Sequence, residues 1–130
     1  MYNKIQTTKP QQFINITSKV AETVKNSNVR DGIAVIFVPH TTAGVTINEN
    51  ADPDVVRDMI SALDKTYPTL GEYSHFEGNS HAHIKASLMG SYCTVIIQDG
   101  KLLLGTWQGI YFCEFDGPRS REFYVKIIGG

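Results

Sequence analysis

The sequence predicts an α+β domain in which mostly antiparallel β-strands pack with two to three helices on an outer side. Many short apolar runs separated by turn residues indicate strands, whereas only two or three segments have a helical pattern. Asp99-Gly100, between two apolar runs, is a strong signal for a two-residue β-hairpin. A length of 130 residues suits one domain, 1–130, with a single core.

The N-terminal part of the chain is predicted to contain two short strands, a helix and a longer strand, at 2–8, 11–16, 17–28 and 33–38. Thr17 or Ser18 can cap this helix through its hydroxyl group. The strand at 33–38 is apolar at both parities. We therefore expect it to be central in its sheet and covered on both faces.

The middle of the chain is predicted to hold a strand at 45–47 and then a helix. Asp52 is the expected N-cap, Pro53 fills the first helical position and Asp54 adds a favourable charge in the first turn. The helix stops before Pro68. Its apolar stripe, which we expect to be buried, is Val55, Val56, Met59, Ile60 and Leu63.

The remaining chain is predicted to begin with a second helix, from near Ser80 to Gly90. Four strands follow, at 92–98, 101–104, 106–115 and 121–128. Glu114 lies on an otherwise apolar strand, so we expect it at an edge or paired with a buried cation, for which Arg119 and Arg121 are the candidates.

The composition excludes two classes of partner. A net charge of −1 provides no electrostatic footprint for nucleic acid or for an anionic membrane. The N-terminus lacks the apolar segment of a signal peptide, and no run approaches the ~18 apolar residues of a membrane span. We expect a cytoplasmic protein that binds neither nucleic acid nor membrane.

Cys93 and Cys113 lie in apolar runs and are predicted to be core residues rather than a disulfide.

Three of the four histidines lie in the segment 73–85: His75, His81 and His83. On a helix, residues two apart lie on nearly opposite sides, so His81 and His83 cannot share one ligand. His83 is flanked by Ala82 and Ile84. We therefore predict that His83 faces inward and His81 outward.

His40 follows the predicted central strand, where functional groups are common. His40, His75 and His83 could converge as a three-histidine zinc site with an open position. No His-x-x-x-His or Cys-x-x-Cys spacing enforces such a site. Substrate-binding or acid–base histidines, and histidines that only hold a loop, remain open as alternatives.

Other polar residues suggest a site for an anion. Gly78-Asn79-Ser80 precedes a predicted helix, whose free N–H groups accept phosphate, and Lys85 lies one turn on. Arg119 could supply a phosphate-pairing guanidinium, or it could be a solvated surface residue. Among the acids, Glu49 has no capping role to explain it, and Glu77 lies in a turn.

Several segments match the pattern of a known family: HTTAGVTINENADPD at 40–54, EGNS at 77–80, AHIKAS at 82–87, LGTWQGI at 104–110 and CEFDGPR at 113–119. Together they resemble the YjbQ-like family, uncharacterised protein family 0047, also called the secondary thiamine-phosphate synthase family. The resemblance extends from about Gln12 to Ile128. One position departs from it, because the family usually has Asp where this sequence has His81.

The resemblance implies a compact β-rich sandwich that assembles as a homotrimer with polar clefts between subunits. It also implies a weak thiamine-phosphate synthase activity, in which a thiazole phosphate displaces diphosphate from an aminopyrimidine-methyl diphosphate. A divalent cation such as magnesium, or Arg and Lys side chains, would neutralise the diphosphate. The residues that fall on the family's motif positions are His40, Glu49, Asn50, Asp52, His75, Glu77, Asn79, His83, Lys85, Trp107 and Gln108.

Two hypotheses follow. In the first, the protein is an enzyme that binds a phosphorylated small molecule at a subunit interface. The expected catalytic residues are His40, Glu49, His75, Glu77 and His83, and the expected substrate-binding residues are Asn50, Asp52, Asn79, Ser80, Lys85, Trp107, Gln108 and Arg119. In the second hypothesis, the protein is a non-catalytic trimer that binds a metal ion or a ligand.

Overall fold

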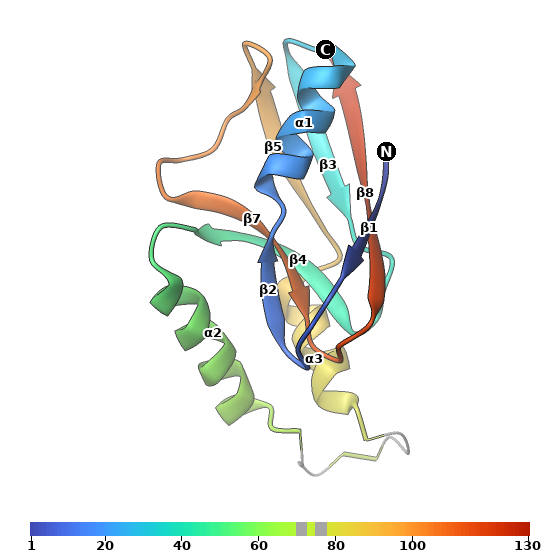
Figure 1. The fold of residues 1–130 in the computed structure, drawn as a ribbon, viewed down its shortest axis with the longest axis vertical. Helices are drawn as coiled ribbons and strands as arrows, with labels where there is room; N and C mark the ends of the chain where they lie inside the picture. The colour runs from blue at the N-terminus through green and yellow to red at the C-terminus, as the bar shows by residue number, and fades with distance from the viewer. Residues whose placement is uncertain (70–72, 75–77) are drawn as a thin grey trace.

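The computed structural model describes residues 1–69, 73–74 and 78–130, and it confirms the predicted α+β fold (Figure 1). A five-stranded antiparallel sheet has the order β1-β8-β3-β5-β6, and a three-stranded antiparallel sheet has the order β2-β7-β4. The elements are β1 (Tyr2–Gln6), β2 (Gln12–Asn15), α1 (Thr17–Ser27), β3 (Gly32–Phe37), β4 (Ala43–Glu49), α2 (Pro53–Thr66), α3 (Ser80–Met89), β5 (Tyr92–Gln98), β6 (Lys101–Leu102), β7 (Gln108–Glu114) and β8 (Ser120–Gly129).

The main core lies between the two sheets and α1. Alternate residues of β3, β5, β7 and β8 point into it, together with Val20 and Val24 of α1. A second, smaller cluster joins α3 and β7, and Val56 and Leu63 of α2 pack against it. This second cluster attaches both helices to the three-stranded sheet.

Local signals in the sequence explain several element boundaries. The Asp52 side chain accepts a hydrogen bond from Asp54 N at 2.9 Å, which confirms the predicted N-cap of α2. Asp99 and Gly100 both have positive φ, as the predicted two-residue hairpin requires. Gly90 ends α3 with φ 98°, also as predicted.

The predicted cap of α1 is wrong. Thr17 is the first residue of the helix, and its hydroxyl oxygen accepts a hydrogen bond from Ile110 N at 2.8 Å. Asn15 Oδ1 instead accepts hydrogen bonds from Thr17 N at 3.0 Å and from Thr17 Oγ1 at 2.6 Å. The Thr17 hydroxyl therefore bonds to β7 and does not cap the helix as the sequence pattern predicted.

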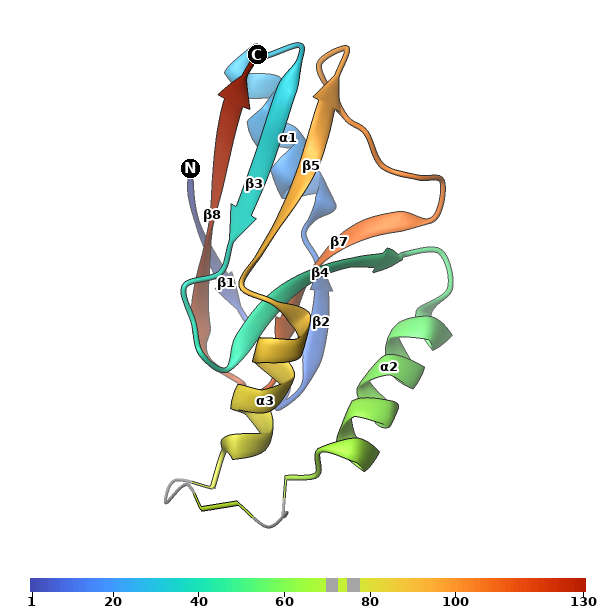
Figure 2. The ribbon, with the colours of Figure 1, turned by 180° about the vertical axis from the view of Figure 1, so that it is seen from behind.

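β3 is central, as predicted, but the described residues cover only one of its faces. Ala34 and Ile36 are buried, whereas Phe37 on the other face is 44% exposed. Phe37 pairs with Tyr92 and Tyr124, which are also exposed and lie on the same face. In Figure 2, α1 lies behind β8, β3 and β5, and no helix crosses in front of them. We call this surface the open sheet face.

The apolar stripe of α2 is also less buried than predicted. Val55, Val56, Met59, Ile60 and Leu63 are half-buried, and no residue of α2 is fully buried in this chain. Val56 and Leu63 are the residues of α2 that pack against the smaller core cluster of α3 and β7. Burial in the isolated chain therefore does not account for the whole stripe.

Both cysteines are free, as predicted. Cys113 is fully buried in the smaller core cluster, and burial raises the pKa of the half-buried Cys93 thiol to about 11. In the described part of the chain, every helix falls short of the length and apolar character that crossing a bilayer requires.

Candidate functional site

A polar hollow of about 400 Å³ lies where the β3–β4 connection, the start of α3 and the β7–β8 connection meet. Its lining is polar apart from Pro39 and consists of Pro39, His40, Thr41, Thr42, Asn79, His83, Asp116, Arg119 and Arg121. A second hollow of about 550 Å³ shares His40, Thr41 and His83 with it and continues along α3 to Tyr92. We call these two connected hollows the polar groove. Through Tyr92 it reaches the open sheet face.

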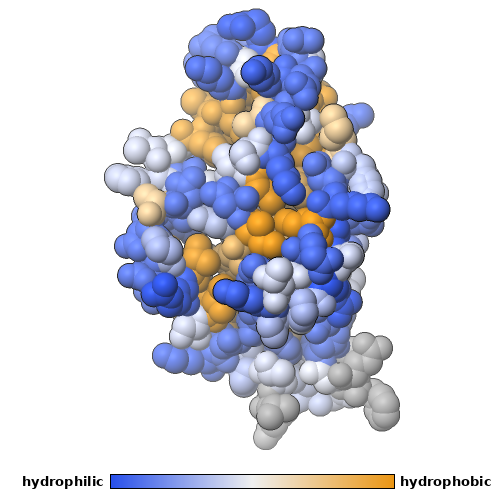
Figure 3. All heavy atoms as spheres, viewed as in Figure 1, coloured by the Kyte–Doolittle hydropathy of each residue, from blue (hydrophilic) through white to orange (hydrophobic). Residues whose placement is uncertain are grey.

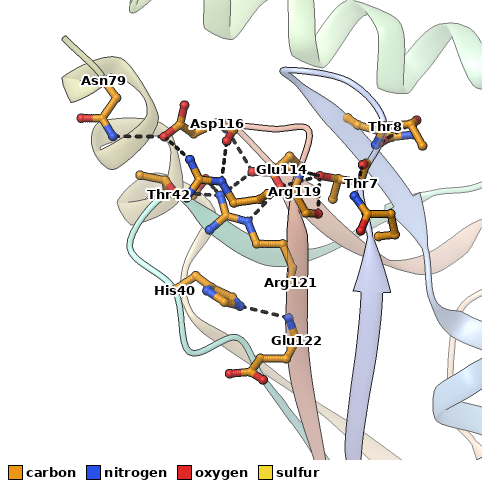
Figure 4. Close-up of polar contacts among 12 residues, drawn as sticks. Thr7, Thr8, His40, Thr42, Asn79, Glu114, Asp116, Arg119, Arg121 and Glu122 are labelled. Carbon is orange, nitrogen blue, oxygen red and sulfur yellow. Dashed lines mark hydrogen bonds and ion pairs between the residues drawn. The ribbon is translucent and has the colours of Figure 1, made fainter. Parts of the chain in front are cut away.

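His40 is held as a neutral hydrogen-bond donor. Its Nε2 accepts a hydrogen bond from Glu122 N at 3.0 Å (Figure 4). Burial lowers the pKa of His40, the charge of Arg121 lowers it further, and Glu122 and Glu114 oppose this only in part. In a neutral imidazole whose Nε2 accepts, the proton is on Nδ1. His40 can therefore donate to a ligand, but this tautomer has no lone pair left for a metal ion.

Arg121 forms a buried ion pair with Glu114, as predicted for that acid. Arg121 Nε donates to Glu114 Oε1 at 2.8 Å, and Nη2 donates to Glu114 Oε2 and to Thr42 Oγ1. Thr7 Oγ1 also donates to Glu114 at 2.8 Å. Burial alone raises the pKa of Glu114, but the hydrogen bonds from Arg121, Asp116 N and Thr7 and the Arg121 charge hold it below its usual value. The carboxylate is therefore ionised and fixes the guanidinium at the groove.

Arg119 also lines the groove and is fixed by Asp116. Arg119 Nη2 donates to Asp116 Oδ2 at 3.0 Å, and Arg119 Nε donates to the Asp116 carbonyl at 2.9 Å. Asn79 Nδ2 donates to the same carboxylate at 3.1 Å, which ties the start of α3 to this pair (Figure 4). Asn79 Oδ1 is buried and has no hydrogen-bond partner in the described part of the chain.

Arg119 and Arg121 each have a hydrogen-bond donor that the described structure does not use. Within residues 1–69, 73–74 and 78–130, nothing accepts a hydrogen bond from Nη1 of Arg119 or of Arg121, although both side chains line the groove. Planar guanidinium donors suit carboxylate and phosphate oxygens. The groove therefore offers fixed donors rather than a large excess of positive charge, because each cation already has an acid beside it.

The two histidines of α3 lie on different sides of the helix, as predicted, but their sides are reversed. His81 is buried, with only 6% of its surface exposed, and His83 is half-buried in the lining of the groove. His81 Nδ1 is 3.1 Å from Lys85 Nζ, one helical turn on. The apolar neighbours of His83 did not predict this orientation, because the buried side of α3 carries the polar His81 and Lys85.

Lys85 is fully buried and does not line the polar groove. Its ammonium group lies 2.7 Å from Asp64 Oδ1, 3.0 Å from Gln11 Oε1 and 3.1 Å from His81 Nδ1. An ammonium group has three donors, so all three are used inside the protein. The prediction that Lys85 pairs with phosphate beside His83 is therefore revised: Lys85 joins α3 to α2 and to Gln11, just before β2.

Five predicted site residues lie at the opposite end of β4 from His40. Asn50 N donates to the Trp107 carbonyl at 2.8 Å, and Glu49 pairs with Gln108 across β4 and β7. Trp107 is 62% exposed, and Asp52 serves as the N-cap of α2. β4 is seven residues long, so this cluster is roughly 20 Å from the polar groove. One small molecule cannot contact both clusters within a single chain.

The structure describes the positions of only some of the other predicted site residues. Asn79 and Arg119 line the groove, and Ser80 begins α3 beside it. His75 and Glu77 lie outside the described residues. Among the residues that are described, no three His, Cys, Asp or Glu side chains come together in a group that could hold a metal ion. The site built from His40, His75 and His83 stays a prediction, and the hydrogen bond at His40 Nε2 does not favour it.

Sequence reasoning missed Asp116 as a residue of the groove, and it did not select Thr41 or Thr42 as site residues. Asp116 is 37 residues from Asn79, and Thr42 is 79 residues from Arg121. The one available signal was Glu114 on an apolar strand, which pointed to a buried cation nearby.

The fold and the groove define a class of small α+β proteins with two antiparallel sheets and a histidine- and arginine-lined site at one end. All of residues 1–130 match the model of the family described as "UPF0047 protein YjbQ-like". The chain belongs to this family.

Relatives from distant organisms are similar over almost their whole length. The chain is 60% identical to UPF0047 protein MJ1081 of Methanocaldococcus jannaschii over 126 residues, which are 97% of this chain and 91% of the relative. It is 52% identical to UPF0047 protein YugU of Bacillus subtilis over 127 residues, 97% of this chain and 96% of the relative. The crystal structure of an uncharacterized conserved protein of the family from Clostridium acetobutylicum has a TM-score of 0.97 at 62% identity, with 98% and 99% of the two chains covered.

Proposed function

We propose that this protein binds a phosphorylated small molecule in the polar groove. The observation that carries the proposal is the pair of fixed guanidinium groups, Arg119 and Arg121, each with an unused Nη1 donor in the described structure. His40 adds a neutral N–H donor. Asn79 and His83, at the start of α3, line the groove, and a helix N-terminus favours phosphate.

We further propose that the bound molecule reacts there, in the way that the family resemblance implies. The thiazole nitrogen attacks the methylene carbon of an aminopyrimidine-methyl diphosphate, and the bond from this carbon to the diphosphate oxygen breaks. Negative charge then builds up on the departing diphosphate. Arg119 and Arg121 would stabilise that charge, since preformed donors require no reorganisation during the reaction. The reaction needs little acid–base chemistry, which suits a groove whose acids are already paired with arginines.

Assembly as a homotrimer is part of the same proposal. The open sheet face carries exposed Phe37, Tyr92, Ile96, Tyr124 and Ile128, a concentration of apolar side chains that a monomer rarely leaves in water. Tyr92 belongs both to this face and to the polar groove. A second copy seated on this face would therefore border the groove. Such a copy could also bring its cluster of Glu49 and Trp107 near the groove, which β4 prevents within one chain.

The reaction is tested by measuring turnover of the pyrimidine diphosphate with thiazole phosphate, and by calorimetric binding of each. We expect Arg119→Gln to lose most of the turnover and to bind the diphosphate about tenfold more weakly, because hydrogen bonds to charged groups contribute ~1.5–3 kcal/mol. Arg57→Gln is the matched control, since Arg57 forms an exposed ion pair with Asp54 on α2. If Arg119→Gln loses binding but the wild-type protein shows no turnover, the result identifies the non-catalytic ligand-binding alternative. Binding unchanged in Arg119→Gln would contradict the site.

The assembly is tested separately with Phe37→Glu, which puts a charge at the centre of the open sheet face. We expect sedimentation to show trimers for the wild type and monomers for Phe37→Glu. Asn26→Glu, on the exposed side of α1, is the control and keeps the trimer. A monomeric wild-type protein would remove the assembly part of the proposal and leave the groove to be judged on its own.

A further inference from the structure

A second groove lies at the other end of the sandwich, between α1 and the hairpin of β5 and β6. Its volume is about 790 Å³, within the range of about 300–1,000 Å³ that is typical of small-molecule sites. Arg30, just before β3, lines it, whereas His40, just after β3, lines the polar groove. The two grooves are therefore separated by the length of β3, roughly 20 Å.

The floor of this second groove is aliphatic. Val24 of α1 is buried beneath it, and Leu102 and Leu104 form the opposite wall with half-buried side chains. Figure 3 shows apolar side chains beside α1 at this end of the molecule, surrounded by polar ones. No aromatic side chain lines the groove in the described structure, so a planar ring would find nothing to stack on. An aliphatic body fits this floor better than an aromatic one.

The rim of this groove is positively charged, although the protein as a whole has a net charge of −1. Lys25, Arg30 and Lys101 line it, against one acid, Asp99. None of these four residues takes part in any of the ion pairs found among the described residues. The three cations are therefore available to an anionic head group, with an aliphatic surface directly below them.

The walls are also fixed relative to each other. Gly100 N donates to the Arg30 carbonyl at 2.9 Å, which joins the turn of the hairpin to the chain that leaves α1. A groove with such walls is present before any ligand arrives, and this lowers the entropic cost of binding. From the aliphatic floor, the cationic rim and these fixed walls, we infer that this groove is a second ligand site, and that it takes an aliphatic chain ending in a single anionic group. This site is independent of the proposed function of the polar groove.

Titration with sodium decanoate, with decyl phosphate and decanol run alongside, tests this inference by calorimetry and by NMR of the methyl groups of Val24, Leu102 and Leu104. We expect both anions to shift these methyl signals and to bind about tenfold more tightly than decanol. Lys25→Gln/Lys101→Gln is expected to remove that difference, whereas Lys19→Gln/Lys126→Gln, with the same loss of charge elsewhere, keeps it. Ala21→Trp, at an exposed position of α1 on the groove, fills the space and abolishes binding.

Four results would overturn the inference. Equal binding of decanol and decanoate would show that the cations do not recognise the ligand. Methyl shifts spread over the whole protein, or binding that persists in Ala21→Trp, would show that the chains bind elsewhere. Absence of binding together with a change of oligomeric state in Ala21→Trp would show that a second copy covers the groove.

Discussion

Arg121 and Lys85 are both buried cations, yet they differ in the hydrogen-bonding capacity that remains for a ligand. Arg121 is held by Glu114, which has no exposed surface, and it keeps Nη1 unused at the polar groove. The ammonium group of Lys85 uses all three of its donors in hydrogen bonds to Asp64, Gln11 and His81. A guanidinium has five donors and an ammonium has three, so equal anchoring leaves only the arginine able to bind something further.

The surroundings of the two ion pairs differ as well. Arg121 is only 4% exposed and Glu114 has no exposed surface, whereas the side chain of Asp64 is 43% exposed beside the buried Lys85. Losing one partner therefore has different consequences. Water cannot replace Glu114, but it can reach the position of the Asp64 carboxylate.

The largest effect is expected for Glu114→Gln. This change leaves Arg121 buried without its counter-ion, and we expect the free energy of unfolding to fall by about 3–5 kcal/mol, as measured by urea denaturation. The double variant Glu114→Gln/Arg121→Met removes both charges and is expected to recover part of that loss. A loss below about 1 kcal/mol in Glu114→Gln would contradict the description of this pair.

A smaller effect is expected for Asp64→Asn, which removes the acid beside Lys85. Because water can reach this site and Gln11 and His81 still accept from Lys85, we expect a loss of about 1–2 kcal/mol. The same denaturation experiment measures it. A loss as large as that of Glu114→Gln would mean that the two networks are equally closed to water.

The smallest effect is a pH dependence that comes from the two histidines. Burial lowers the pKa of His81, the Lys85 charge lowers it further, and Asp116 and Asp64 only partly oppose this. The pKa of His40 is also lowered, chiefly by burial. Below the ordinary histidine pKa of 6.5, the unfolded chain therefore binds protons that the folded chain does not. Stability is full above this pH and falls as the pH decreases below it.

Denaturation at several values between pH 7 and pH 5 measures this slope, which is at most about 1.4 kcal/mol per pH unit for each linked proton. The window lies above the range in which Glu114 and Asp64 titrate, because their pKa values are lowered from 4.5 and 3.8. His81→Gln keeps an acceptor for Lys85 but cannot be protonated, so we expect a flatter slope. An unchanged slope would rule out His81 as its source.

Local signals in the sequence were sufficient for much of the fold. The Asp99-Gly100 turn, the Asp52 cap and the end of α3 at Gly90 depend on residues close in the chain, so they could be predicted. The buried partner of Glu114 could be predicted in kind, because an acid on an apolar strand needs a cation. The choice of Arg121 could not be predicted, because β7 and β8 lie in different sheets and their relative orientation decides which arginine faces Glu114.

The orientation of side chains could not be read in the same way. An apolar pattern on both sides of β3 does not say whether its second cover comes from this chain or from another, and Phe37 remains exposed here. The motif positions shared with the family were recognised together, yet β4 separates His40 from Glu49 and Trp107. The buried side of α3 carries Lys85, whose partner Asp64 is 21 residues away in the sequence, so the sequence around α3 did not identify this side.

The contrast between Arg121 and Lys85 leads to one direct test of the polar groove. Calorimetric binding of inorganic diphosphate is compared in the wild type, in Arg119→Gln, which alters the second arginine of the groove without disturbing the buried pair, and in Lys85→Met. We predict about tenfold weaker binding for Arg119→Gln and binding within about twofold of the wild type for Lys85→Met. Loss of binding in Lys85→Met with wild-type affinity in Arg119→Gln would contradict this assignment of the groove.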